Sequence, residues 1–556
     1  MAKRKRDEAG QRQEAARKTM KADSDADADA DSSVNTNSQK QDPASHQRTQ
    51  TPGAVTIQII TGSYERVLHG ITATVSNPSA DDESAQTVQF VDNFLFQAHA
   101  SAIKCLALGP LPEQKQQTSS QPDGPQKVVL ASGGTDERVN LYTLSASPPS
   151  ASDSAKFPTI PTLAGNKILE NPKNRELGSL LHHSSAITAL YFPSRSKLLS
   201  AAEDNTIAVT RTRDWSVVST IKAPRPKVQG RPSGDTAPPG GAPAGVNDFA
   251  VHPSMKLMLT VGRGEKCMRL WNLVTGKKAG VLNFDRKILE SVLEGKYSSG
   301  EGRRISWDSE GEEFTVAFER GAVVFGIDSV PTRVLLPSPR TKFHQMKYID
   351  VGMSSGNKRE LLALSTEDGR ILFYSTKTNA QPPSTAESNK DATKPSLPAA
   401  QLIAQLGGKD HGQASRIKDF EALPIKAQGW NNDKTFLMVT SSSDGAVKLW
   451  MLNETEFPAA LEDGSSGKKK AKSDSRSQKN GISSTSDSAG ASASSAAAQV
   501  GKLLGTYESS NRITCMKAFV MLAPVAGELD ESDISESDEG RGEGNEEDSS
   551  GSENED

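Results

Sequence analysis

The sequence predicts an all-β protein: a seven-bladed β-propeller with a split closing blade and with disordered termini and inserts. Three observations predict this fold: a hairpin at residues 434–450, the recurrence of that hairpin, and complementary strands at the two ends of the chain. In the hairpin, two short apolar runs flank a turn at Asp444 and Gly445. Asp-Gly between β-prone runs is a strong hairpin signal, because Gly takes positive φ without penalty and Asp bonds back to its own backbone.

The hairpin recurs along the chain. Trp450 follows Asp444 by six residues, a spacing that resembles the WD-repeat signature, the inner hairpin of a propeller blade. Further copies begin at Asp136, Asp204, Glu265, Arg320 and Asp368, and the position six residues later holds Tyr142, Thr210, Trp271, Gly326 and Tyr374 respectively. The copies that end at Thr210 and Gly326 lack the aromatic residue and are degenerate. Repetition in one register indicates a propeller far more strongly than a single copy would.

An apolar segment precedes each copy, as expected for the first strand of a blade. These segments are residues 102–108, 186–192, 246–251, 304–307, 343–348 and 416–420. Residues 55–60, 66–75 and 88–96 read as three strands without a first strand, whereas residues 512–520 read as a first strand with nothing after it. Pairing the two ends closes the ring and leaves no long unpaired edge.

The composition is consistent with one propeller interrupted by polar segments. The chain has 556 residues, a hydrophobic content of 35% and a net charge of -4. The propeller is expected over residues 53–523, with low-complexity inserts at 110–126, 145–175, 224–245, 377–398 and 454–500, where extra length leaves the sheets undisturbed. No apolar run approaches the roughly 20 residues that cross a bilayer, so no membrane association is predicted.

The two tails carry opposite charge. Residues 1–52 form a basic and polar tail and residues 524–556 an acidic one, and both compositions predict disorder. The cluster Lys3, Arg4, Lys5 and Arg6 predicts nuclear targeting, and a second basic run lies at residues 468–472. Ser535, Ser537 and Ser552 stand just before acidic residues, so they are candidate sites for an acid-directed kinase.

Four turn residues and three histidines resemble a catalytic set. Asp136, Asp204, Asp368 and Asp444 occupy corresponding turns, with His99, His183 and His411 upstream of the first strands of three blades. A buried carboxylate is costly unless several donors satisfy it, and recurrence around a ring indicates a structural role. The chain shows no nucleophile elbow and no phosphate-binding loop, and His182 and His183 have no partners at metal spacing. The sequence therefore predicts a binding platform without catalytic, cofactor-binding or metal-binding residues.

Several motifs in the first half of the chain narrow the prediction. They are residues 62–65 with Gly70, residues 96–107, residues 133–137 with Val139, residues 181–190 with Glu203 and Asp204, and residues 246–254 with residues 269–273. Together they resemble the WD-repeat family of the fungal maintenance-of-killer propeller and its animal counterpart, the PAK-interacting protein. The resemblance covers residues 55–283 well and the later blades weakly.

The resemblance implies a function in the nucleus and nucleolus. Members of this family are assembly factors for the large (60S) ribosomal subunit and its rRNA processing, with a regulatory link to PAK-type kinases. The implied partners are pre-60S ribosomal proteins and assembly factors, with a PAK-type kinase as a further candidate and RNA contact left open. The protein would then be a monomeric propeller within a larger particle, a scaffold that acts through its faces.

The sequence also suggests where partners bind. The turns that contain Arg138, Arg213, Trp215 and Arg263 are candidate contacts, since Arg and Trp are enriched at interface hot spots. If charge reversal there left binding intact, the interface would lie on the opposite face. Two other functions remain open at this point: a regulator of a PAK-type kinase in signalling, and a chaperone that binds basic nuclear proteins through its acidic tail.

Overall fold

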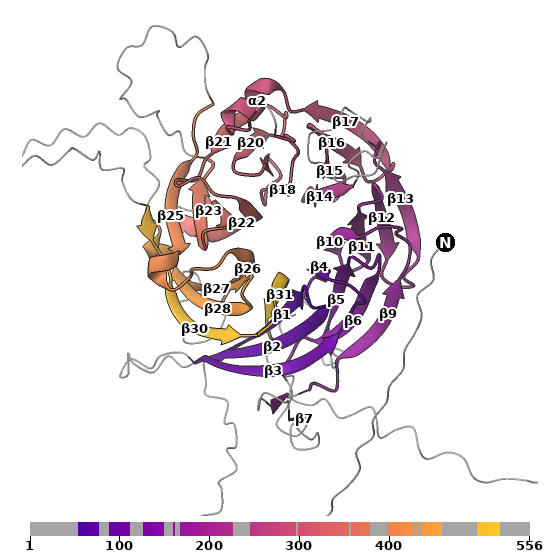
Figure 1. Ribbon diagram of the computed structural model, residues 1–556, viewed down its shortest axis with the longest axis vertical. Helices are drawn as coiled ribbons and strands as arrows, with labels where there is room; N and C mark the ends of the chain where they lie inside the picture. The colour runs from indigo at the N-terminus through magenta and orange to yellow at the C-terminus, as the bar shows by residue number, and fades with distance from the viewer. Residues whose placement is uncertain are drawn as a thin grey trace, which may run out of the picture. The chain divides into compact units, whose positions relative to one another are not determined.

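The computed structural model describes residues 54–76, 88–111, 126–148, 160–161, 167–168, 170–225, 245–295, 298–354, 357–377, 397–425, 430, 435–458 and 497–522. Within these residues the strands form seven sheets arranged in a ring, with the first strand of each sheet nearest the axis (Figure 1). The seven-bladed propeller that the sequence predicts is therefore confirmed. No helix in the described residues is long and apolar enough to span a membrane.

The first four blades follow one another along the chain. Blade 1 contains β4 (Ile103–Leu108), β5 (Lys127–Gly134), β6 (Val139–Ser145) and β9 (Arg175–Leu180). Blade 2 contains β10 (Ile187–Ser194), β11 (Lys197–Ala202), β12 (Thr206–Arg211) and β13 (Val217–Lys222). Blade 3 contains β14 (Val246–Val251), β15 (Leu257–Gly262), β16 (Cys267–Asn272) and β17 (Lys277–Asn283), and blade 4 contains β18 (Arg304–Trp307), β19 (Glu313–Ala317), β20 (Ala322–Gly326) and β21 (Pro331–Leu335).

The remaining blades include strands from distant parts of the chain. Blade 5 contains β22 (Phe343–Ser354), β23 (Asn357–Thr366), β24 (Arg370–Ser375), β25 (Gln401–Gly407) and β29 (Ala498–Gln499). Blade 6 contains β26 (Ile417–Pro424), β27 (Thr435–Ser442), β28 (Ala446–Asn453) and β30 (Lys502–Glu508). Blade 7 contains β31 (Ile513–Val520), β1 (Val55–Ser63), β2 (Val67–Val75), β3 (Val88–Gln97), β8 (Lys167–Ile168) and β7 (Ile160–Pro161). The described helical turns are α2 (Arg286–Ser291), η1 (Lys409–His411) and η2 (Glu454–Glu456).

The turn between β27 and β28 shows why the repeat needs Asp followed by Gly. Gly445 has a φ of 96°, and a Cβ there would lie 2.7 Å from the carbonyl oxygen of Asn511. Oδ1 of Asp444 accepts hydrogen bonds from the Ser442 hydroxyl at 2.5 Å and from the Ala446 amide at 3.2 Å. Gly therefore allows the close approach of the next blade, and Asp satisfies the polar groups of the tight turn.

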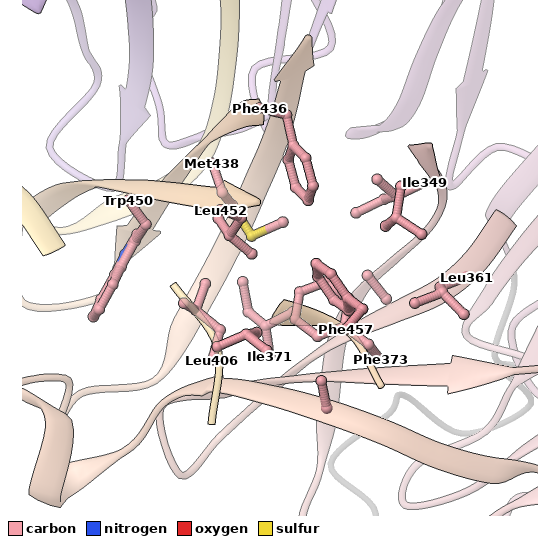
Figure 2. Packing of buried hydrophobic residues seen from close by; sticks show 14 of the residues in the cluster. Ile349, Leu361, Ile371, Phe373, Leu406, Phe436, Met438, Trp450, Leu452 and Phe457 are labelled. Carbon is pink, nitrogen blue, oxygen red and sulfur yellow. The ribbon is translucent and has the colours of Figure 1, made fainter. Parts of the chain in front are cut away.

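The hydrophobic core lies between neighbouring blades. Each of the seven described clusters of buried side chains combines residues from two adjacent blades, and the degenerate copies in blades 2 and 4 contribute like the others. Between blades 5 and 6, Phe373 and Phe436 both pack against Phe457, with Phe373 edge-on at a centroid distance of 5.2 Å (Figure 2). A blade cannot bury its faces alone, so the ring has to be complete to be stable.

The ring closes by pairing the two ends of the described chain. Strand β31 is antiparallel to β1, with Ile57 opposite Val520 and Gly62 opposite Cys515. The predicted split closing blade is confirmed. A second closing contact lies farther out, where the Tyr507 hydroxyl of β30 donates to Asp92 Oδ1 at 2.6 Å and His69 Nε2 lies 3.0 Å from the same oxygen.

The two ends of the ring carry different turns. We call the end at which the first strands begin the upper face, and it also carries the turns between second and third strands. The lower face is the opposite end, with the turns between first and second strands and between third and fourth strands. Strand β1 begins and strand β31 ends at the lower face, so the described chain both enters and leaves the ring there.

Three of the long inserts cover the outer edge of the preceding blade. Strand β8 pairs in parallel with β3, β29 pairs in parallel with β25, and Ala399 forms a parallel bridge to Val334 of β21. Each covering segment lies between the third and fourth strands of the following blade. These segments of the inserts add to the sheets, because they protect edges that would otherwise be unpaired.

Replacing Gly62 with Ala is expected to destabilise the closed ring. A Cβ at Gly62 would lie 2.7 Å from Ile103 and 2.8 Å from Cys515, both of which are packed side chains. We expect the free energy of unfolding to fall by about 1–3 kcal/mol, because the neighbours must shift within a dense core. Chemical denaturation followed by intrinsic fluorescence measures this change. Gly295→Ala is the control, since a Cβ there meets no atom within 4 Å; equal losses in both variants would contradict the packing argument.

Candidate functional site

The predicted turn aspartate of blade 1 belongs to a hydrogen-bonded network. His99 Nδ1 lies 3.0 Å from Asp136 Oδ1, and His99 Nε2 lies 2.8 Å from the Ser132 hydroxyl. Asp136 Oδ2 also accepts the Ala100 amide at 3.0 Å. Burial lowers the pKa of His99 in spite of the neighbouring carboxylate. The imidazole thus links the segment before β4 to the turn after β5.

Blade 2 repeats the arrangement with a second histidine beside it. His183 Nδ1 lies 3.2 Å from Asp204 Oδ2, and the Nε2 atoms of His182 and His183 both lie within 2.9 Å of the Ser200 hydroxyl. Burial would raise the pKa of Asp204, but hydrogen bonds from His183, Thr206 and Ser184 hold it well below its usual value. Both histidines are committed to protein groups, which agrees with a structural role.

Blades 3 and 5 satisfy the equivalent acid with arginine, which the sequence analysis missed. Arg269 Nη2 donates to Glu265 Oε1 at 2.6 Å, and Arg370 Nη2 donates to Asp368 Oδ2 at 2.6 Å. The spacing of acid and arginine differs between the two hairpins, four residues in blade 3 and two in blade 5, so no common sequence signal marks these pairs. In blade 6, His411 lies in η1 with an exposed side chain, and Asp444 bonds to Ser442 instead. The inclusion of His411 in the histidine set is therefore wrong.

The aromatic position of the repeat lies on the third strand, buried against the second. Trp271 Nε1 donates to the Thr260 hydroxyl at 2.9 Å, and Trp450 Nε1 donates to the Thr440 hydroxyl at 3.1 Å. Tyr142 and Tyr374 fill the position in blades 1 and 5, and burial raises the pKa of Tyr142 to about 12. The recurring residues therefore join neighbouring strands within each blade.

The four candidate contact residues do not share one face. Arg138 and Arg263 lie in turns between second and third strands, on the upper face, whereas Arg213 and Trp215 lie between β12 and β13, on the lower face. Trp215 also packs against the core cluster between blades 1 and 2. The expectation of a single interface made by all four is wrong, because successive turns of an antiparallel sheet alternate between its two ends.

Other sequence predictions lie outside the described residues. They are the nuclear-targeting cluster Lys3, Arg4, Lys5 and Arg6, the basic run at residues 468–472, the candidate phosphorylation sites Ser535, Ser537 and Ser552, and most of the predicted tails and inserts. These stay predictions.

A cavity at the upper face opens where the first strands of five blades begin. It has a volume of about 320 Å³, and its charged and imidazole side chains are Lys104, Arg263, Arg303, Arg304, His344 and Glu301. Three carboxylates outside the lining, those of Glu203, Glu319 and Asp248, contact its cations, and the lining itself holds four cations and one carboxylate when His344 is neutral. We call the charged and imidazole side chains of the lining the cationic mouth. Its members come from four separate segments of the sequence, at residues 104, 263, 301–304 and 344, so no single local motif marks it.

Carboxylates behind the cationic mouth form ion pairs with its cations but do not occupy all of their N–H donors. Lys104 Nζ and Arg263 Nη2 approach the same Glu203 oxygen at 2.9 and 3.0 Å, and together they lower the pKa of Glu203 although burial opposes the shift. Arg303 lies 3.7 Å from Glu319, and Arg304 lies 3.8 Å from Asp248. Those two distances exceed an ordinary hydrogen bond, so both guanidinium groups keep donors for a further acceptor.

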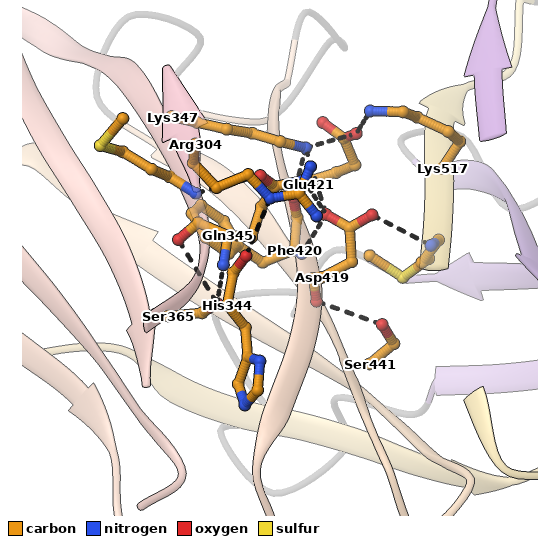
Figure 3. Close-up of polar contacts among 12 residues, drawn as sticks. Arg304, His344, Gln345, Lys347, Ser365, Asp419, Phe420, Glu421, Ser441 and Lys517 are labelled. Atoms are coloured by element: carbon orange, nitrogen blue, oxygen red, sulfur yellow. Dashed lines mark hydrogen bonds and ion pairs between the residues drawn. The ribbon is translucent and has the colours of Figure 1, made fainter. Parts of the chain in front are cut away.

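A second charged cluster, on β22, β26 and β31 farther from the upper face, is electrically balanced. Lys347 Nζ lies 2.6 Å from Glu421 and 3.6 Å from Asp419, and Lys517 Nζ lies 2.7 Å from Glu421 (Figure 3). Burial lowers the pKa of Lys347 despite these partners, and Asp419 also accepts the Met516 amide. Two lysines and two carboxylates satisfy one another here, in contrast to the cationic mouth.

The chemistry that this arrangement supports is anion binding. Among the described residues, no group of three or more His, Cys, Asp or Glu side chains could hold a metal ion. Burial raises the pKa of Cys105 to about 12, which keeps that thiol protonated and a poor nucleophile. The cationic mouth offers guanidinium and ammonium donors in a concave site, which suits carboxylate or phosphate oxygens.

Comparisons with known proteins agree with the fold and its repeats. The WD domain, G-beta repeat family matches residues 174–209, from β9 into β12. Protein MAK11 of Saccharomyces cerevisiae is 26% identical over 73% of this chain and 80% of its own length. The p21-activated protein kinase-interacting protein 1-like of Danio rerio is 23% identical over 73% of this chain and 76% of its own length. Shk1 kinase-binding protein 15 of Schizosaccharomyces pombe is 25% identical over 57% and 68% respectively.

Replacing Asp136 with Ala is expected to lower stability and not to remove a chemical activity. The change leaves His99 and the Ala100 amide without their acceptor in a buried site. We expect a loss of about 2–3 kcal/mol in the free energy of unfolding, the usual consequence of breaking a buried hydrogen-bonded network. Thermal and chemical unfolding measure it. Arg138→Ala, two residues away and exposed, should stay within about 0.5 kcal/mol of the parent.

The stability of the ring is expected to fall as the pH drops from 7 to 5. Burial lowers the pKa of both His182 and His344 to about 4, so the unfolded chain binds protons that the folded chain excludes below pH 6.5. Each histidine should then reduce the free energy of unfolding by about 1 kcal/mol at pH 5, half of the unscreened value because both side chains are only partly buried. The measurement is the unfolding midpoint against pH.

The matched variants separate these histidines from the general effect of acid. The double variant His182→Gln, His344→Gln should flatten the profile between pH 7 and 5, and His411→Gln, at an exposed side chain, should leave it unchanged. A profile that is equally steep in the double variant would show that other groups cause the dependence.

Proposed function

The chain belongs to the WD-repeat family of MAK11 and the p21-activated protein kinase-interacting proteins, and on this premise we propose that it is a non-catalytic scaffold for assembly of the large ribosomal subunit. The observation that carries the proposal is the similarity to MAK11 along 73% of the chain. It agrees with the resemblance in residues 55–283, which implies a nucleolar assembly factor with pre-60S ribosomal proteins and other assembly factors as partners. The basic cluster at Lys3–Arg6 and the acidic tail suit a nucleolar setting.

The ring supports a scaffold because its binding surfaces are fixed by packed cores. Seven inter-blade clusters hold the turns of the upper face at set positions, so a partner meets a surface that is already ordered. The His, Asp, Ser and Trp groups that resemble catalytic residues are engaged with one another within the blades. The cationic mouth supplies a polar, concave site on the same face.

Gradient sedimentation of nuclear extract with a tagged chain tests this proposal. The protein should migrate with precursors of the large ribosomal subunit, and its depletion should reduce the rRNA intermediates of that subunit. The small-subunit intermediates serve as the internal control and should stay unchanged. Migration only as a small free species, together with normal rRNA processing after depletion, would rule the assembly function out.

A second function is favoured by the relatives named for kinase binding. The Danio rerio relative is named as a p21-activated kinase-interacting protein, and the Schizosaccharomyces pombe relative as a binder of the kinase Shk1. If this chain regulates such a kinase, purified protein should bind the kinase directly and change its activity. The same chain in the gradient would then sediment as a free species or with the kinase.

A further inference from the structure

Together with the groups that contact it, the cationic mouth has five cations and four carboxylates: Lys104, Arg263, Arg303, Arg304 and Lys342 against Glu203, Asp248, Glu301 and Glu319. Glu203 is paired with two cations, Lys104 and Arg263. Glu319 is also paired with two, because Lys342 Nζ lies 2.8 Å from its carboxylate and Arg303 lies close to it as well. Each of these carboxylates thus neutralises only part of the positive charge beside it. Farther along the first strands, Lys347 and Lys517 are matched by Asp419 and Glu421, so that cluster carries no such excess.

The pKa values of neighbouring groups reflect this positive potential. His344 lies at the cavity wall, and its pKa is lowered first by burial and then by Lys418, Arg416, Arg304 and Lys342, all of which are cations. Lys418 shows the same effect, since burial and then Arg416 and Arg512 lower its pKa. His344 Nε2 is buried and has no hydrogen-bond partner. A bound anion would relieve the repulsion among these cations.

Donor geometry adds a second reason to expect an anion. Arg304 donates its Nε to the His344 carbonyl oxygen at 3.2 Å, which fixes the plane of the guanidinium group. Its Nη1 lies 3.8 Å from Asp248, and Arg303 lies 3.7 Å from Glu319, so neither pair is a direct hydrogen bond. Oriented guanidinium groups with free N–H donors bind carboxylates in a bidentate manner.

We propose that the cationic mouth binds an extended acidic segment of a partner protein, through the carboxylates of neighbouring Asp and Glu side chains. A polypeptide suits the site better than a nucleic acid, because Glu301, Glu203 and Glu319 would repel an unbroken line of phosphates. A peptide can place its carboxylates at the cations and other residues beside the glutamates. The evidence for this binding site is the cationic mouth itself, so the site does not depend on the proposed assembly function.

The described ends of the chain leave the upper face accessible. Strand β1 starts and β31 finishes at the lower face, so neither described end runs across the cationic mouth. Arg303 has a half-exposed side chain, and Arg263 is exposed to a similar degree. The exposure of these two arginines lets an incoming carboxylate reach them before it meets the more buried Arg304.

Fluorescence anisotropy with the full chain tests the proposal. The probe is a short fluorescein-labelled peptide with consecutive Asp and Glu residues, and the matched control peptide carries Asn and Gln instead. The acidic peptide should bind, and Arg303→Glu should weaken that binding by about tenfold or more, since it reverses a charge inside the site. Glu301→Gln should tighten binding about threefold by removing the carboxylate from the same wall. Higher salt should weaken binding.

The control variant lies on the opposite face. Arg213→Glu changes the overall charge as Arg303→Glu does but lies at the lower face, so it should leave the affinity unchanged. Three results would overturn the proposal: no binding of the acidic peptide, equal binding of the Asn and Gln peptide, or equal weakening by Arg213→Glu. Tighter binding of single-stranded RNA that is lost in Arg303→Glu would assign the cationic mouth to phosphates instead.

Discussion

The pairing of β31 with β1 is the interaction on which the rest of the structure depends. It joins residues separated by almost the whole chain, from Ile57 opposite Val520 to Gly62 opposite Cys515. Bringing these distant segments together is entropically costly. The cost is offset by the burial of two inter-blade cores that would otherwise face water. Because each blade packs against two others, opening one junction exposes apolar surface on both sides. The closed ring is therefore a cooperative unit, and the positions of all upper-face turns follow from its closure.

Much of this architecture could be predicted because the relevant signals are local. Asp444 with Gly445 specifies a turn, and Trp450 six residues later specifies the pairing of third and second strands through Thr440. Even the degenerate copies form blades: Thr210 is buried at the position of the aromatic residue, and in blade 4 Phe325, the residue before Gly326, is buried instead. Neighbouring side chains replace the packing that the missing aromatic residue would provide. In blade 4, for example, Phe314 stacks on Phe325. Propensity and period determine the strands, while packing compensates for a missing residue.

The features that sequence reasoning missed are those that depend on contacts between distant segments. Nothing near Glu203 predicts that Lys104 and Arg263 will meet there, because blades 1, 2 and 3 come together only in the ring. The division of Arg138 and Arg213 between two faces follows from strand direction, which turn composition alone does not report. Likewise, a polar insert gives no sign that two of its residues, Ala498 and Gln499, will pair with β25. These are consequences of topology, and they appear only once the order of strands is known.

The charges on the first strands explain why the upper ends of these strands are suited to binding and their middle parts are not. Around Asp419 and Glu421, the charges of Lys347 and Lys517 are matched at 2.6–3.6 Å, and a visiting ion would have to break pairs that are already formed. Breaking a partly buried pair leaves an uncompensated charge, which costs several kcal/mol. At the cationic mouth the opposite holds, since an added carboxylate reduces repulsion among cations that share too few acids. The same innermost strands therefore provide rigidity along their length and a recognition site where they begin.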